Sequence, residues 1–165
     1  MNFAIKSIRS MTLGALAAAL CAVTTASAQV PQYGTSINLE TARKVMAAAG
    51  AEAKKQGWPM AIAVVDNAGQ LVAYERMDNT QTASVHVAVE KAVSSATYRR
   101  STKAFQDLVA GGGLGMRILG LPGAVPIEGG LVLMQDGKLI GAIGVSGMAS
   151  DQDGVVAKAG VDAIK

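Results

Sequence analysis

The chain has 165 residues, half of them hydrophobic, and a formal net charge of +3. Fifteen basic and twelve acidic residues leave no excess of positive charge large enough for a nucleic-acid-binding surface. With one histidine and one cysteine, a structural zinc site, a Cys–His dyad and a multi-histidine metal centre are excluded.

The first 28 residues have the pattern of a secretory signal peptide. Lys6 and Arg9 precede an apolar stretch, residues 11–23, and Ala26-Ser27-Ala28 forms a small-residue cleavage site. Cleavage after this site removes Cys21 and lowers the net charge to +1, since two cations and no acid leave. We therefore expect a periplasmic or secreted protein that is not inserted in the membrane and folds without a disulfide.

Residues 29–36 read as a flexible lead-in, and residues 37–165 as a single domain. The first predicted helix begins after Asn38 (or Ser36) and runs to about residue 56. Its apolar residues recur at helical spacing: Leu39, Ala42, Val45, Met46 and Ala49. Two apolar strands follow, residues 60–65 and 70–77, joined by a turn at residues 66–69. They predict a β-hairpin.

A polar linker, residues 80–83, leads to a second long helix. Its stripe is made of Val85, Ala88, Val89, Ala92, Val93 and Ala96. Arg99 and Arg100 lie at the end of this helix, where cations suit the helix dipole. Ser101 is the predicted cap of a shorter helix to about residue 109. The glycine-rich residues 111–123 read as an irregular loop.

The last part of the chain predicts a second hairpin and a terminal helix. Asp136-Gly137 joins two apolar strands, residues 131–135 and 138–145, and this dipeptide is typical of a tight hairpin turn. Ser150-Asp151-Gln152-Asp153 reads as the cap of the helix. Because hairpins dominate the strand connections, we predict an α+β fold with an antiparallel sheet flanked by helices.

Two glycine-rich motifs do not match a known catalytic pattern. Gly144-Val145-Ser146-Gly147 lacks the spacing of a nucleophile elbow, and His86 is the only candidate base for a catalytic triad. Residues 111–115 follow a helix instead of a strand and lack the lysine of a phosphate-binding loop. Neither motif predicts an active centre.

Four residues between the first hairpin and the short helix are candidates for a ligand site. His86 and Glu90 are four residues apart and lie on one side of a helix. They are either ligands of a bound group or a solvated pair beside the apolar stripe. Lys91 either meets an anionic ligand or keeps its ammonium in water beside the apolar stripe. Arg76 ends a strand and could hold a carboxylate or pair with Asp78.

The fourth candidate, Thr102, opens the short helix, whose free N–H groups favour an anion or an oxygen ligand. Ser101 alone would satisfy a plain cap. Three methionines in or near loops, Met77, Met116 and Met148, could ligate haem iron or fill gaps in packing.

Taken in order, these motifs resemble the family of small haem-binding and haem-degrading-type proteins that includes GlcG and HbpS. The resemblance covers residues 37–164. It rests on Asn38-Leu39-Glu40, Ala63-Val64-Val65-Asp66 with Gly69, Arg76-Met77-Asp78, Lys91-Ala92 with Ser101-Thr102, and Gly141-Ala142-Ile143-Gly144-Val145-Ser146-Gly147 with Gln152-Asp153. The last motif is the most specific.

The resemblance implies a profilin-like α+β domain that forms homo-oligomers and takes haem as its cofactor. Thr102 matches a threonine at the haem contact of secreted relatives, with Ser101 in place of their proline and Lys91 at the same spacing upstream. In the haem hypothesis, Arg76 and Lys91 pair with the propionates, Thr102 contacts the iron side, and His86 is the axial ligand.

Three functions follow from these observations. The first is an exported small-molecule-binding protein that sequesters haem and degrades it slowly. The second is a non-catalytic accessory subunit or partner of a periplasmic oxidoreductase or sensory system, suggested by alanine-rich helix faces. The third, an enzyme acting on small organic acids, ranks last because no pair of acid–base groups is visible.

Overall fold

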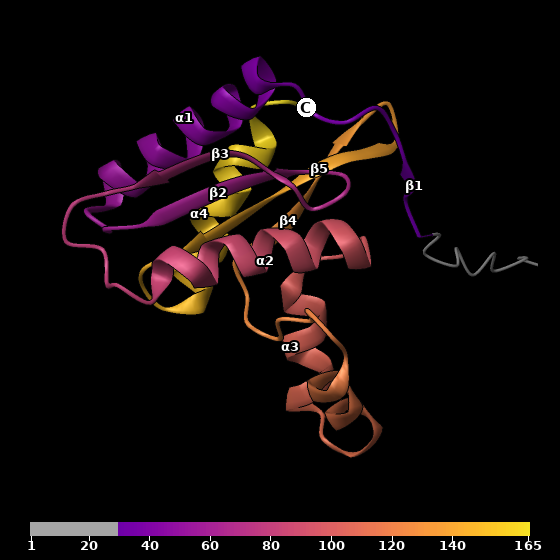
Figure 1. The fold of residues 1–165 in the computed structure, drawn as a ribbon. Helices are drawn as coiled ribbons and strands as arrows, with labels where there is room; N and C mark the ends of the chain where they lie inside the picture. The colour runs from indigo at the N-terminus through magenta and orange to yellow at the C-terminus, as the bar shows by residue number, and fades with distance from the viewer. Residues whose placement is uncertain (1–29) are drawn as a thin grey trace, which may run out of the picture.

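A five-stranded sheet forms the centre of residues 30–165, the part of the chain that this computed structural model describes (Figure 1). Its central strand is β5 (Lys138–Ser146), which pairs antiparallel with β2 (Ala61–Asp66) and β4 (Gly130–Gln135). β3 (Leu71–Arg76) pairs antiparallel with β2 and forms one edge of the sheet. The short β1 (Gln32–Tyr33) pairs parallel with the start of β5.

Helices cover both faces of the sheet. α1 (Leu39–Gln56) and α4 (Ser150–Asp162) lie on one face, and α2 (Ser84–Tyr98) lies on the other. α3 (Thr102–Ala110) and the 3₁₀ helix η1 (Gly113–Gly120) extend away from the sheet (Figure 1). The predicted α+β class, both hairpins and the order of the main helices are confirmed. Among the described residues, no helix is long and apolar enough to span a bilayer.

Alternation along the strands separates two apolar layers, because neighbouring side chains of a strand point to opposite faces. Ile62 and Val64 of β2 face α1 and α4, in a core where larger apolar residues outnumber the alanines. Ala61 and Ala63 face α2, which presents Ala88, Ala92 and Ala96. The α2 layer is therefore made almost entirely of small side chains.

The small residues bring α2 unusually close to β5. A Cβ atom placed on Gly144 would lie 2.0 Å from the carbonyl oxygen of Ala88 and 2.5 Å from the amide nitrogen of Ala92. No side chain fits in that space, since real Cβ contacts are never so short. The glycine of the Gly-Val-Ser-Gly motif is thus required by packing.

Helix caps agree with the sequence at two of three predicted sites. The Asn38 side chain accepts a hydrogen bond from the amide of Thr41 at 2.8 Å, and Ser101 accepts one from Ala104. The third cap is different: Ala149, before Ser150, is the cap residue of α4. Only the Gln152 side chain reaches back to it, accepting the Ala149 N–H at 3.2 Å.

Within residues 29–36, the predicted flexible lead-in, Gln32 and Tyr33 form the short strand β1. Tyr33 also donates a hydrogen bond to the carbonyl of Ala96 and carries the guanidinium of Arg99 over its ring. These contacts fix the segment against β5 and the end of α2. Residues 113–120 of the predicted irregular loop form η1. The predicted signal peptide lies outside the described residues.

Candidate ligand-binding site

The structure divides the four candidate residues between two places. Arg76 and His86 are exposed and lie near the edge of the sheet formed by β3. Lys91 and Thr102 are buried on the other side of α2, next to the backbone of Gly129 and Gly130. A site that uses all four residues together is therefore not present in this arrangement.

Lys91 belongs to an ion pair inside the protein. Its ammonium lies 2.7 Å from the Asp153 carboxylate, and the two side chains are 1% and 3% exposed. It also donates to the carbonyl of Val145 at 3.1 Å. The expectation that Lys91 keeps its ammonium in water is wrong, because Asp153 offers a buried partner. With its charge paired here, Lys91 has no open side toward a propionate.

The Asp153 carboxylate sits at the crossing of three segments. One oxygen pairs with Lys91 of α2, and the other accepts the amide of Met148 at 3.2 Å, in the loop that follows β5. Burial raises the pKa of the Asp153 carboxyl above its ordinary value, against the opposing effect of the Lys91 ion pair. Asp153 lies in the first turn of α4, where the helix dipole also favours a negative charge.

Thr102 is enclosed as completely as Lys91. Its side-chain oxygen accepts the amide of Gly130 at 2.9 Å and so fixes the start of β4 to the start of α3. Gly129 has a φ of +125°, and a Cβ there would lie 2.8 Å from the Lys91 ammonium nitrogen. The Gly129-Gly130 pair lets the chain pass between Lys91 and Thr102. Lys91 and Thr102 therefore stabilise the fold in this structure and do not face a ligand.

His86 lines a shallow groove between β3 and α2. The groove has a volume of about 380 Å³, and its lining is mostly apolar: Leu71, Tyr74, Val85, Val89, His86 and Glu90. His86 and Glu90 come from α2, as the spacing of four residues predicts. An apolar groove with one imidazole is a suitable environment for a flat hydrophobic ligand that contains a metal.

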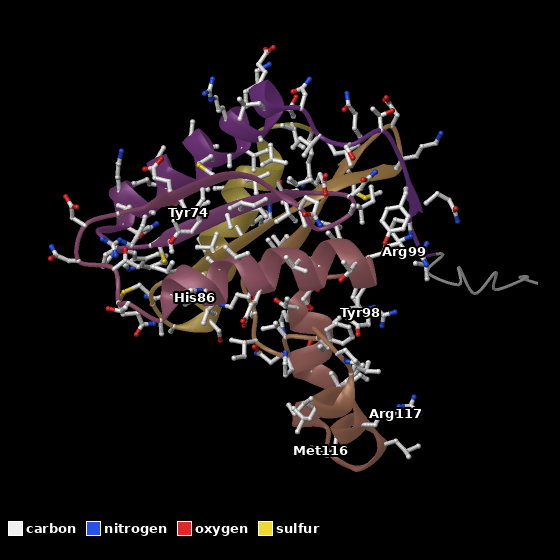
Figure 2. The ribbon with its side chains drawn as sticks, in the orientation of Figure 1. Tyr74, His86, Tyr98, Arg99, Met116 and Arg117 are labelled. Carbon is white, nitrogen blue, oxygen red and sulfur yellow. The ribbon has the colours of Figure 1, made fainter. Side chains whose placement is uncertain are left out.

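Tyr74 lines this groove from β3, whereas His86 lines it from the start of α2 (Figure 2). It pairs with Ala63, whose side chain packs against α2, so Tyr74 points toward α2 as well. Its hydroxyl is buried and has no hydrogen-bond partner among the described residues. Burial raises the pKa of the Tyr74 hydroxyl, so this group stays a phenol at neutral pH.

Arg76 lies two residues beyond Tyr74 on β3. It pairs with Ala61, another residue of the α2 layer, and therefore projects on the same face of the strand as Tyr74. The structure thus brings Arg76 and His86 to the same side of the sheet, at the strand end and the helix start that flank the groove. Tyr74 is the residue that sequence reasoning missed. Its spacing of two from Arg76 was the available signal.

A larger hollow lies elsewhere, between β1 and the hairpin of β4 and β5. It has a volume of about 740 Å³ and is lined by polar and small residues, among them Thr35, Asp136 and Lys138. It lacks the histidine and the apolar wall of the groove at His86. We therefore take the groove at His86 as the candidate ligand site, because its histidine and apolar lining suit a ligand better than the larger, more polar hollow does.

The fold and the groove define a small α+β domain with an apolar, histidine-containing surface site. The match to known proteins is specific: residues 37–162 fit the model of the family described as haem degrading protein HbpS-like. The chain belongs to this family. The GlcG/HbpS-like resemblance seen in the sequence is confirmed.

Three relatives illustrate the family. Protein GlcG of Escherichia coli K12 is 37% identical over 110 residues, which are 67% of this chain and 81% of GlcG. The structure of a double mutant of HbpS from Streptomyces reticuli superposes with a TM-score of 0.73 at 27% identity, covering 81% of this chain and 90% of HbpS. A complex of PduOC with haem has a TM-score of 0.72 at 26% identity, covering 79% and 96%.

Proposed function

We propose that this protein binds haem in the groove between β3 and α2, with His86 as the axial ligand of the iron. The observation that carries the proposal is the placement of the single histidine of the chain, exposed, on an apolar groove. Imidazole is a common axial ligand of haem iron in proteins. A haem-bound relative with the same fold supports the choice of ligand.

The residues of the groove fit a haem, whereas those of the buried cluster do not. Leu71, Val85 and Val89 offer apolar contact for a porphyrin face, and Arg76 is an exposed guanidinium on the same side of the sheet, suited to a carboxylate. Lys91 and Thr102 have their partners inside the protein. Haem, when bound, supplies the redox chemistry of its iron, and the chain supplies the imidazole and the apolar wall.

Titration of the purified protein with haem, followed by absorption in the Soret region, tests this function. We expect a saturable shift at micromolar haem. A linear increase without saturation, equal to that of haem in buffer, contradicts the proposal. Sequestration is the role we favour. Slow degradation would require loss of the Soret band in the presence of a reductant and oxygen, and it is checked in the same cuvette.

The cellular location forms part of the proposal. Residues 1–28 have the composition of a signal peptide, and we propose a periplasmic or secreted protein that meets haem outside the cytoplasm. Fractionation of cells that produce the full chain tests this location: we expect a cleaved product in the periplasm or the medium, and an uncleaved cytoplasmic product contradicts it.

A surface of exposed apolar side chains supports self-association. We call α3 and η1, residues Thr102–Gly120, the arm. The arm extends from the body (Figure 1), and Leu114 and Leu119 on it are 81% and 59% exposed, with Leu108 and Met116 nearby in the chain. Exposed apolar patches often mark protein interfaces. We propose that a second copy covers this surface in a homo-oligomer.

Light scattering coupled to size exclusion checks the oligomer at micromolar concentration. Replacing Leu114 and Leu119 with Ser should shift the mass toward the monomer, and replacing the exposed Val155 of α4 with Ser is the matched control. A monomeric wild-type protein contradicts the homo-oligomer. The alternative role, an accessory subunit of a periplasmic oxidoreductase or sensory system, predicts that this surface instead recovers a second protein in pull-down at native abundance.

A further inference from the structure

The groove at His86 contains one polar group that the fold leaves without a partner. The hydroxyl oxygen of Tyr74 is buried, and no hydrogen bond to it is formed by the described residues. Buried polar groups in native proteins are nearly always paired, because an unpaired donor loses its bonds to water and gains none in return. A phenylalanine would fill the same space at lower cost.

The position of Tyr74 suggests where its partner comes from. The residue is half-buried and lines the groove opposite Val85, His86 and Val89 of α2. Two other tyrosines provide the contrast: Tyr33 donates to the carbonyl of Ala96, and Tyr98 donates to the carbonyl of Pro122. Only the tyrosine in the groove lacks such an acceptor among the described residues.

We propose that the phenol of Tyr74, which is closed to water in the free protein, is uncovered when a ligand binds in this groove and donates a hydrogen bond to a carboxylate of that ligand, near the guanidinium of Arg76. This inference rests on the proposed function and specifies the ligand further, as an apolar ring that carries acidic side arms. Arg76 follows Tyr74 on the same face of β3, just beyond the residues that line the groove, so its exposed guanidinium can reach an acidic arm that extends past Tyr74. His86 lies on the opposite wall, on α2.

The direction of the hydrogen bond follows from the state of the phenol. A tyrosine hydroxyl has an ordinary pKa of about 10, so the O–H proton is retained at neutral pH. A neutral phenol donates well to a carboxylate and binds ferric iron poorly, since a tyrosine ligand of iron is deprotonated. Tyr74 therefore recognises the ligand through its periphery, whereas His86 is the residue that meets the metal.

The experiment compares two ligands and three proteins. Haem and its dimethyl ester, which lacks both carboxylates, are titrated into wild type, Tyr74→Phe and Tyr98→Phe. For haem, Tyr74→Phe should weaken binding roughly tenfold, the lower range for a hydrogen bond to a charged acceptor. For the ester, the loss should be no more than about threefold, because the acceptor is uncharged. Tyr98→Phe should bind both ligands as wild type does.

Each contrary result has a distinct meaning. An equal loss for haem and ester, or no loss for either, overturns the role of Tyr74 while the haem site stands. Failure of wild type to bind haem at all overturns both proposals. A readout without ligand completes the test: Tyr74→Phe should melt at least as high as wild type, since it removes an unpaired buried hydroxyl. A lower melting temperature means that the hydroxyl has a partner in the free protein, and it contradicts the inference.

Discussion

The ammonium of Lys91 and the carboxylate of Asp153 form a buried ion pair at 2.7 Å that joins α2 to α4. The two residues are 62 positions apart in the chain. Water is excluded from both charges, so each depends on the other for its stabilisation. The pair also ties together the end of β5, through the Val145 carbonyl and the Met148 amide.

Replacing Lys91 with Met should reduce the free energy of unfolding by about 3–5 kcal/mol, because the Asp153 carboxylate is left buried without a counter-charge. Urea denaturation followed by circular dichroism measures the loss. Replacing Asp153 with Leu in the same protein should recover part of it. Lys103→Met breaks the exposed ion pair with Asp107 and should change stability far less than Lys91→Met does, because water screens both charges. Equal effects of Lys91→Met and Lys103→Met contradict the burial of the pair.

The ionisation of Asp153 should make the stability of the protein depend on pH. The pKa of the Asp153 carboxyl is raised above the ordinary value of an aspartate in the folded protein, chiefly by burial. The folded state then holds the proton more tightly than the unfolded state. The protonated Asp153 carboxyl therefore contributes its full stability below the pKa that it has in the unfolded state. This contribution is lost as the pH rises through its higher pKa in the folded state. Asp153→Asn should remove this fall in stability.

Carbon NMR of the Asp side chains checks the direction of both shifts. The exposed Asp162 has its pKa lowered by hydrogen bonds from Lys158 and Lys165. We therefore expect the Asp153 carboxyl to titrate at higher pH than that of Asp162. The reverse order would show that the Lys91 ion pair outweighs the desolvation of the Asp153 carboxylate.

Thr102 should affect stability and leave haem binding unchanged. Thr102→Val removes the acceptor of the Gly130 amide and leaves a buried N–H unpaired, at an expected cost of about 1–3 kcal/mol. The matched control is Thr97→Val, at an exposed residue whose hydroxyl donates only to Val93 of its own helix. If Thr102→Val instead weakens haem binding at unchanged stability, Thr102 contacts the ligand, as the family resemblance first implied.

The close contact of α2 with β5 predicts opposite effects of two glycine substitutions. Gly144→Ala must push α2 away from the sheet, because the added carbon lies 2.0 Å from the Ala88 carbonyl, and should cost about 1–3 kcal/mol or more. Gly50→Ala lies within α1 with nothing within 4 Å of the added carbon and should stabilise by about 0.5–1 kcal/mol. Thermal melts of both variants test the prediction. Similar melting temperatures for the two contradict the close packing.

Local patterns predicted most of the fold. The Asp136-Gly137 turn, the Asn38 and Ser101 caps and the two helical stripes depend on neighbouring residues, and the structure has them where the sequence places them. β1 was missed because two residues carry no periodicity, and its pairing with Lys138 and Leu139 is formed across more than a hundred positions. Whether such a short segment forms a strand depends on its pairing with a distant part of the chain.

The candidate site was predicted less well for the same reason. His86 and Glu90 lie on one groove because both come from one helix, which spacing can reveal. The burial of Lys91 depends on Asp153, a distant residue that the sequence pattern indicates only as part of a helix cap. The role of Tyr74 depends on β3 packing beside α2, and this contact between a strand and a helix is set by the fold as a whole.

Haem binding through His86 is the central claim, and one comparison tests it most directly. Wild type, His86→Ala and the control Glu90→Gln, from the same groove, are titrated with ferric haem while absorption and electron paramagnetic resonance spectra are recorded. We predict a saturable, nitrogen-ligated spectrum for wild type and for Glu90→Gln, and for His86→Ala a changed spectrum with affinity lower by at least about tenfold, the equivalent of one lost ligand interaction. An identical spectrum and affinity in His86→Ala would contradict the claim.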